Sequence, residues 1–339
     1  MDREEKTGME PERLAQVLSR MLGKEVIRAD CRLEKLHGGT LGDVQLAAGI
    51  AETADGNKEP YRLVWKTQKR FERHGDPLSW RREYDLYAAP DLDKLLPKSF
   101  RRPACYRAEL NDEEIQLWLE YIDGRSGMEL TTDMQEQIAR EWGRIQGRLY
   151  AEQPAALRNL PHLSQVEYTK NGYLRYRSWQ ELHARIRSDG CGLPKHLRQM
   201  LIDFDEQADA VFSRIEQLPV VLCHRDFWVA NLFHTDDGIV LIDWDTAGWG
   251  YMGEDIASLI ADEADVPRMI EIYRTCVPAY LSGFNECSGA APIADPFIYE
   301  RMLMMYGYRL VEWHEFAGSP EEKRLQLDTL QQIYDMKPA

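Results

Sequence analysis

Cysteine is scarce in this sequence, and its spacing carries no metal-binding or disulfide pattern. Only six of the 339 residues are cysteines, and no two of them form a C-x-x-C pair. Scattered single cysteines favour neither a zinc site nor a disulfide framework. We therefore expect a reduced protein of the cytoplasm.

Long apolar stretches are also missing. No uncharged span reaches membrane length, and the first residues, Met1–Lys6, lack the apolar core of a signal peptide. Both absences agree with a cytoplasmic location and with no membrane partner.

Positive charge is in deficit, because 42 Lys and Arg face 57 Asp and Glu and leave a formal net charge of −15 at pH 7. Nucleic acids and anionic membranes favour clustered Lys and Arg, so neither is expected as the main partner. The acidic balance is compatible with a cationic substrate. A solvated acidic surface explains the charge more simply.

The composition that remains is that of a globular protein, with 44% hydrophobic and 29% charged residues. A chain of 339 residues is long enough for two domains or for one large bilobal unit. No internal repeat or low-complexity tract is evident.

The N-terminal third alternates between helical and strand periodicity. Apolar residues recur at helical spacing over Pro11–Leu22, and Asp76-Pro77 supplies the start signal for a second helix, Leu78–Ala88. Alternating apolar residues predict five strands. The strands are expected at Val26–Leu36, Val44–Ile50, Tyr61–Lys66, Ala104–Leu110 and Ile115–Ile122.

After residue 122 the helical period dominates. Helices are expected at about 132–150, 173–188, 194–216, 254–263, 266–284 and 297–316, and the only strand signal there is one hairpin. The change of period predicts an α+β, bilobal fold. Residues 1–122 would form a small lobe with a five-stranded antiparallel sheet, and residues 123–339 a larger helical lobe.

That hairpin carries the strongest chemical signal in the chain. One apolar run, Leu218–Cys223, leads into a loop that contains Asp226 and Asn231, and a second run, Gly238–Ile242, leads to Asp243. An Asp-Gly turn between the runs favours a hairpin, which would bring these three polar side chains together. Two carboxylates and an amide oxygen are the ligands that a hard cation such as Mg²⁺ prefers.

The spacing H-x-D-x-x-x-x-N, followed by an Ile-Asp strand end, resembles the catalytic loop and metal-binding aspartate of the aminoglycoside phosphotransferase/choline kinase-like family. This family is a branch of the protein-kinase-like fold, and the resemblance covers most of residues 25–316. It implies an ATP- and Mg²⁺-dependent kinase that moves the γ-phosphate of ATP to a hydroxyl of a small molecule. The acceptor would be an aminoglycoside-like antibiotic, an amino alcohol or a sugar metabolite, so antibiotic resistance and metabolism both stay open.

The resemblance assigns roles around the hairpin. Asp226 would be the catalytic base or the residue that orients the acceptor hydroxyl, and Asn231 and Asp243 would hold Mg²⁺. His224 and Asp255 would support the backbone of the loop. Three further assignments are less determined: Trp228 lines the acceptor pocket or packs the loop, Asp245 is an extra metal ligand or an exposed acid, and Arg225 stands where the antibiotic kinases commonly have glycine.

In the N-terminal part, Lys66 would contact the α/β-phosphates and be held by Glu83. Taken singly, a lysine at a strand end is usually a solvated edge charge. The other nucleotide-binding residues are implied by their position in the family's fold. They lie in a glycine loop, which without the resemblance is a plain hairpin tip, and in a linker beside the adenine. They are Gly38, Gly39 and Thr40 in the loop and Glu120 and Ile122 in the linker.

Two clusters of acids and aromatics are candidates for the acceptor site, where they would suit an amino group. Solvated helix faces explain each cluster equally. The candidates are Asp262, Glu263 and Asp265 in the first cluster, and Glu312, Trp313 and Glu315 in the second.

Two other functions were weighed. A protein serine/threonine kinase is disfavoured because Asp243-Trp244-Asp245 stands where Asp-Phe-Gly is expected and no Ala-Pro-Glu follows. A nucleotide-binding scaffold without turnover is disfavoured because Lys66, Asp226 and Asn231 are all retained with Asp243.

Overall fold

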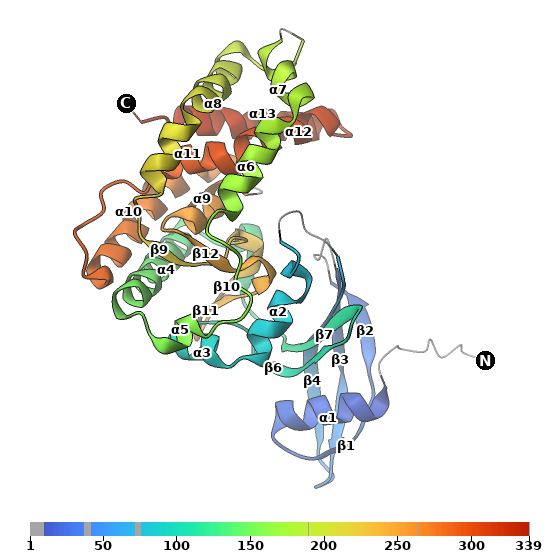
Figure 1. Ribbon diagram of the computed structural model, residues 1–339. Helices are drawn as coiled ribbons and strands as arrows, with labels where there is room; N and C mark the ends of the chain where they lie inside the picture. Colours follow the sequence, from blue (N-terminus) through green and yellow to red (C-terminus); the bar gives the residue numbers. More distant parts are fainter. Residues whose placement is uncertain (1–9, 37–41, 72–75, 189, 263, 339) are drawn as a thin grey trace.

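The computed structural model describes residues 10–36, 42–71, 76–188, 190–262 and 264–338. Four of the proposed site residues, Gly38, Gly39, Thr40 and Glu263, lie outside these ranges. The chain forms two lobes, as the change of period predicts, with a curled sheet in the smaller lobe and helices in the larger one (Figure 1). No helix among the described residues is long and apolar enough to cross a membrane.

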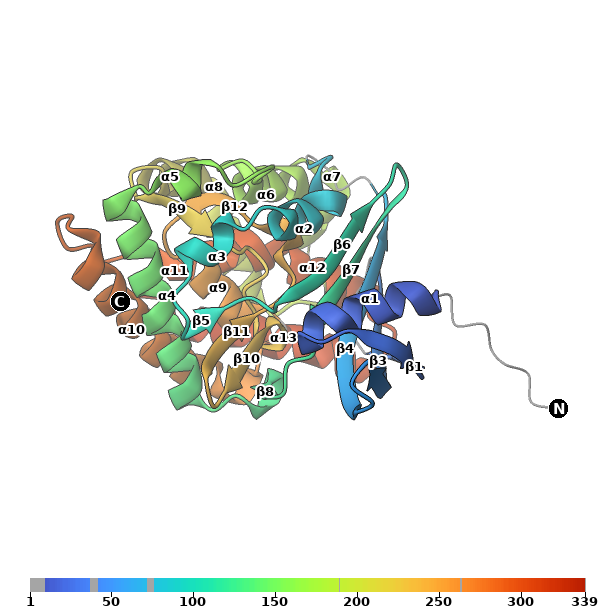
Figure 2. The same ribbon diagram turned by 90° about the horizontal axis from the view of Figure 1, so that it is seen from below.

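The smaller lobe is an antiparallel sheet with strand order β1-β3-β4-β7-β6, and β2 also pairs with β3. Helix α1 (Pro11–Leu22) lies against the sheet (Figure 2), and its Leu14, Val17 and Leu18 are buried there. The strands are β1 (Val26–Ala29), β2 (Arg32–Lys35), β3 (Gly42–Thr53), β4 (Lys58–Lys69), β6 (Cys105–Leu110) and β7 (Glu114–Glu120).

The sheet thus has six strands rather than the five predicted. The stretch expected as one strand, Val26–Leu36, is divided into β1 and β2, which pair in succession along the same strand, β3. Between them the side chain of Asp30 accepts a hydrogen bond from the backbone N–H of Ile50 at 2.6 Å. When a side chain accepts a backbone N–H that would otherwise bond to the neighbouring strand, the strand is interrupted at that residue.

Lys66 lies inside β4 and not at its end, because β4 continues to Lys69. Helix α2 (Ser79–Ala88) follows and packs against β6 and β7. The buried residues of α2 include Glu83, so the fold brings this carboxylate under the sheet.

The larger lobe is built around two long helices that pack closely together, α4 and α10. A Cβ on Gly143 or Gly283 would lie within 2.3 Å of a backbone carbonyl oxygen of the facing helix, so only glycine permits this approach. Thr131 caps α4 by accepting from the backbone N–H of Met134. The longer helices are α4 (Thr132–Glu152), α6 (Tyr168–Ser178), α7 (Gln180–Arg187), α8 (Lys195–Ile215), α9 (Glu254–Ala261), α10 (Met269–Ser288), α12 (Tyr308–Phe316) and α13 (Pro320–Asp335).

Several helix predictions change in detail. The stretch 173–188 is two helices, α6 and α7, and the first begins at Tyr168. The stretch 297–316 is also divided, into α11 (Ile298–Met302), one π-helical turn at Leu303–Gly307, and α12. A π turn inserts one extra residue into the helical repeat and is frequent at functional sites.

Short strands accompany the helices of the larger lobe. The predicted hairpin is present as β10 (Leu232–Thr235) and β11 (Gly238–Leu241), whose register pairs Leu232 with Leu241. Strand β11 also pairs with β5 (Phe100–Arg101), and β10 with β8 (Arg125–Ser126). A strand that the pattern did not predict, β12 (Gly248–Tyr251), pairs with β9 (Val220–Cys223).

The core of the larger lobe centres on Trp142 of α4. Its ring stacks on Phe100 at 5.3 Å and on Phe227 at 5.2 Å between centroids. Leu86 and Leu92 belong to the same core, so part of the chain before residue 122 packs into the helical lobe. A division into residues 1–122 and 123–339 stays a proposal.

Candidate active site

One cavity of about 710 Å³ lies between the lobes. Gly42, Lys66 and Gln68 line it from the sheet. From the helical lobe it is lined by residues of α6, α12 and the π turn, by Asp262 directly after α9, and by residues of the loop 224–231, called the catalytic loop after the family resemblance. The predicted residues Asp226, Asp243 and Asp262 are among them, and so is Asp245. The cavity therefore joins residues that lie far apart in the sequence.

The hairpin places its three polar residues as the spacing predicted. The amide Nδ2 of Asn231 donates to the backbone oxygen of Asp226 at 2.9 Å and to its carboxylate Oδ2 at 2.7 Å. The backbone N–H of Ile242, next to Asp243, donates to the backbone oxygen of Asn231 at 3.0 Å. Asp243 itself has φ of 64°, a left-handed conformation that is uncommon outside glycine and often found at functional sites.

Lys66 connects the two lobes at the floor of the cavity. Its Nζ lies 2.6 Å from Oε2 of Glu83 and 2.5 Å from Oδ1 of Asp243, a residue 177 positions later. Burial alone would lower the pKa of Lys66, but Asp243, then Glu83 and Asp245, outweigh burial and raise it well above its ordinary value. The ammonium group therefore stays charged.

Asp255, at the start of α9, lies beneath the catalytic loop. It accepts from the backbone N–H groups of His224 at 3.1 Å and Arg225 at 2.8 Å, and from Trp142 Nε1 at 2.8 Å. Burial raises its pKa to about 6, although these donors oppose the shift. These are the contacts expected of a residue that holds the loop backbone in place.

His224 is fully buried beside the same loop. Its ring packs edge-on against Trp244, with 4.8 Å between the centroids. Burial lowers its pKa to about 4, so the imidazole is neutral near pH 7. A neutral buried ring fits the supporting position that the sequence predicted.

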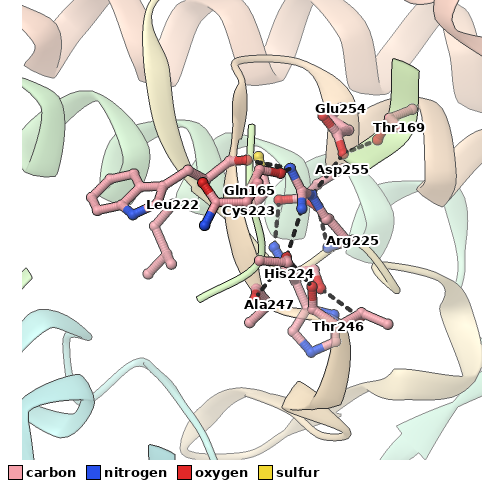
Figure 3. Close-up of polar contacts among 12 residues, drawn as sticks. Gln165, Thr169, Leu222, Cys223, His224, Arg225, Thr246, Ala247, Glu254 and Asp255 are labelled. Carbon is pink, nitrogen blue, oxygen red and sulfur yellow. Dashed lines mark hydrogen bonds and ion pairs between the residues drawn. The ribbon is translucent and has the colours of Figure 1, made fainter. Parts of the chain in front are cut away.

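Arg225 forms a buried polar cluster that sequence reasoning did not foresee (Figure 3). Its Nε lies 2.9 Å from Oε1 of Glu254, and the two side chains are only 1% and 2% exposed. Its Nη groups donate to Ser164 Oγ at 2.6 Å and to the backbone oxygen of Gln165 at 2.8 Å, and also reach that of Trp249.

The same cluster extends to the wall of the cavity. Thr169 Oγ1 donates to Oε1 of Glu254, and the guanidinium of Arg225 lies 4.9 Å from the ring centroid of Tyr168. Tyr168 and Thr169 begin α6 and line the cavity together with Asp226. Arg225 thereby links the catalytic loop to the cavity side of α6.

Glycines make room for this cluster. A Cβ on Gly248 would lie 1.9 Å from Ser164 Oγ and 2.9 Å from Nη1 of Arg225, and one on Gly250 would lie 2.8 Å from Oε2 of Glu254. The Gly-x-Gly spacing in β12 was the available sequence signal, since glycine inside a strand often marks a close approach of other groups.

The residues proposed for the acceptor site differ in their position relative to the cavity. Asp262 lines the cavity, where it accepts from the hydroxyl of Tyr306 at 3.1 Å and lies 3.8 Å from Arg309. Trp313 is covered by the guanidinium of Arg309, 4.3 Å from its ring centroid. Trp228 packs against the core and is not a lining residue of the cavity.

The two linker residues proposed to lie beside the adenine do not line the cavity. Glu120 forms a two-fold ion pair with Arg101, at 2.6 and 2.8 Å, and neither it nor Ile122 lines the cavity. A role of Glu120 and Ile122 in nucleotide binding stays a prediction.

The comparisons with known proteins agree with this geometry. Residues 102–283 match the phosphotransferase enzyme family. No curated protein sequence matches the chain.

Solved structures share the fold at low sequence identity. A microcompartment-associated aminopropanol kinase is 16% identical with a TM-score of 0.56, and 94% of each chain is covered. A choline kinase from Cryptosporidium parvum Iowa II is 14% identical with a TM-score of 0.54, covering 90% of this chain and 88% of that one. An amicoumacin kinase in complex with AMP-PNP, Ca²⁺ and Ami is 14% identical with a TM-score of 0.54, covering 90% of this chain and 89% of that one.

The family match spans more than half of the chain, and it includes Asp226, Asn231, Asp243 and Asp255. The protein therefore belongs to the phosphotransferase enzyme family and has the protein-kinase-like fold.

Proposed function

We propose that the protein is a small-molecule kinase that transfers the γ-phosphate of ATP to an alcohol group of its acceptor. The observation that carries the proposal is the meeting of Lys66, Asp226 and Asp243 in one cavity, with Asn231 bonded to Asp226. Similar structures include an aminopropanol kinase, a choline kinase and a kinase bound to an ATP analogue, which agrees with this chemistry.

The donor set of the site fits a divalent cation such as Mg²⁺. Asp243 and Asp245 present carboxylate oxygens to the cavity, and the amide of Asn231 is oriented by its two bonds to Asp226. The described part of the chain holds no cluster of three His, Cys, Asp or Glu that could bind a metal by itself. Mg²⁺ keeps waters and phosphate oxygens as ligands, so a few protein ligands suffice, and it would neutralise charge on the phosphates.

The side chains divide the remaining work. Lys66, held by Glu83, binds phosphate oxygens of the nucleotide. The acceptor oxygen attacks the γ-phosphorus, the bond from that phosphorus to the bridging oxygen breaks, and ADP leaves with the electron pair. Asp226 orients the acceptor hydroxyl and takes its proton, with its carboxylate fixed by Asn231.

The division of roles between the lobes and the expected charge of the acceptor were inferred from the sequence alone. Residues 1–122 are proposed as the nucleotide-binding lobe and residues 123–339 as the catalytic and acceptor-binding lobe. The net charge of −15 was the reason to expect a cationic acceptor.

ADP formation from Mg-ATP tests the function directly. The purified chain is incubated with amino alcohols, sugars, hydroxy acids, aminoglycosides and a mixed peptide substrate, and Asp226→Ala serves as the matched variant. We expect acceptor-dependent ADP formation in the natural chain, none in the variant, and similar Mg-ATP affinity in both. Equal turnover by the variant would contradict the role of Asp226, and phosphorylation of peptides alone would indicate a protein kinase.

A further inference from the structure

The charged groups that line the cavity fall into two sets. Lys66, Asp226, Asp243 and Asp245 serve the nucleotide, the cation and the transfer in the proposed function. The other charged lining residues lie on the helical side, in α6, in α12, in the catalytic loop and directly after α9. They are Arg175, Arg225, Arg309 and Asp262.

The carboxylates and the indole that the sequence offered for a cationic acceptor are engaged by other residues, and only Asp262 among them lines the cavity. Asp262 accepts from Tyr306 and faces Arg309. Glu312 accepts from the hydroxyl of Tyr176 at 2.8 Å, and Arg309 covers the ring of Trp313. An ammonium group would have to displace an arginine from the carboxylate and from the aromatic face.

Among the charged lining residues on this side, three arginines face one carboxylate, Asp262. Arg175, on an exposed turn of α6, makes no ion pair with any residue that the structure describes, and it lies beside Tyr176 at 5.6 Å from its ring centroid. Arg309 is 38% exposed, and its contact with Asp262 is long, at 3.8 Å. Arg225 is buried against Glu254 and contributes little charge to the opening.

Guanidinium groups bind carboxylate and phosphate oxygens through two parallel N–H donors, which favours such ligands over neutral ones. We propose that the acceptor is a hydroxylated small molecule with an anionic group, a carboxylate or a phosphate, that Arg175 and Arg309 bind while its hydroxyl faces Asp226. This inference rests on the proposed function. The transfer itself is the step already described, and the anionic group takes no part in it.

A matched acceptor series tests the inference. Three compounds of one carbon skeleton, 3-hydroxypropionate, 1,3-propanediol and 3-amino-1-propanol, are compared by ADP formation from Mg-ATP, with glycerate and glycerol 3-phosphate to separate carboxylate from phosphate. Binding of each compound to the Mg-ATP complex is measured by calorimetry. We expect kcat/KM for the anionic compounds to exceed that for the amine by about tenfold or more, as one charge-assisted contact provides.

Arginine variants identify the groups responsible. Arg175→Gln and Arg309→Gln should each lower kcat/KM for the anionic acceptor by about tenfold, and both should leave the neutral diol and Mg-ATP affinity unchanged. Arg185→Gln is the control, because Arg185 is exposed on α7, pairs with Glu315 and is not a lining residue. Arg175 is exposed, so its variant remains informative if Arg309→Gln destabilises the fold.

The outcomes separate this inference from the proposed function. Preference for the amine, equal loss on the neutral diol, or no response to any anionic compound in turnover or binding overturns the inference. If ADP forms with amines or neutral alcohols, the kinase function survives that result. If Mg-ATP does not bind and no acceptor of any charge supports ADP formation, the proposed function fails instead.

Discussion

Replacing Arg225 by methionine removes the positive charge from the buried cluster beside the catalytic loop and nearly preserves the volume of the side chain. Glu254 is 2% exposed and would lose its ion pair with Arg225, although the buried Arg301 still attracts it, while Ser164 and the backbone oxygens of Gln165 and Trp249 would lose donors. Breaking a buried ion pair on one side costs about 3–5 kcal/mol, because the remaining charge is left uncompensated. That loss is a large fraction of a typical folding free energy of about 5–15 kcal/mol.

A double-mutant cycle measures this coupling. The free energies of unfolding in urea are compared for the natural chain, Arg225→Met, Glu254→Gln and the double variant. We expect the double variant to recover about 2–3 kcal/mol relative to the sum of the single losses, because it leaves no unpaired charge. The exposed pair Arg144–Glu286, with side chains 39% and 55% exposed, provides the control cycle and should couple by less than about 1 kcal/mol.

The cluster also has a local readout, since Arg225 holds the segment that leads into α6. Hydrogen exchange in residues 164–178 should rise in Arg225→Met more than in Arg102→Met, a buried arginine that binds Asp93 and Leu86 instead. Additive losses in the cycle, or equal exchange in the two variants, would refute the reasoning. Arg225→Gly should be more stable than Arg225→Ala by about 1–2 kcal/mol, because both lose the cluster but only glycine accepts the φ of 69° without strain.

Three further predictions address the loop and its surroundings. Asp243→Ala should abolish the Mg²⁺ dependence of ATP binding, and an unchanged Mg-ATP affinity in calorimetry would contradict the metal assignment. His224 has a pKa of about 4 in the folded chain against an ordinary 6.5, so the unfolded state binds more protons between these values and stability falls as pH decreases. From pH 7 to pH 5 the free energy of unfolding in urea should fall by about 2 kcal/mol more in the natural chain than in His224→Asn. Parallel pH profiles of the two proteins would disprove the lowered pKa of His224. Gly248→Ala should lower the free energy of unfolding by about 1–3 kcal/mol, because its Cβ would overlap Ser164. Gly56→Ala is the control, because nothing lies within 4 Å of its Cβ, and it should cost only the strain of its φ of 81°.

Local patterns were sufficient for the hairpin and for most helices. The apolar run Gly238–Ile242 and the Asp237-Gly238 turn predict β11 and the turn, and the structure pairs Leu232 of β10 with Leu241 of β11. The other run, Leu218–Cys223, contains β9, which pairs with β12 instead. Asn231 directly precedes β10 and Asp243 closely follows β11, so this register brings the two together, and Asp226 joins them through its bonds with Asn231.

Elements that depend on distant partners were missed or altered. Strand β12 alternates two glycines, which disfavour strands, with Trp249 and Tyr251, and it is completed by β9 and Ser164 as its neighbours. The division of the first predicted strand depends on the bond between Asp30 and Ile50, which periodicity does not reveal.

The sequence by itself determined the order of the proposed catalytic residues, the bilobal α+β architecture and the family resemblance, because each rests on short-range spacing. Only the tertiary structure decided which charges meet. Lys66 lies against Asp243 across 177 positions, and Arg225 lies between Glu254 and the start of α6. Two of the acids expected to attract a cationic acceptor, Asp262 and Glu312, are engaged by Tyr306, Tyr176 and Arg309, because the helices that carry these groups converge only when the larger lobe packs.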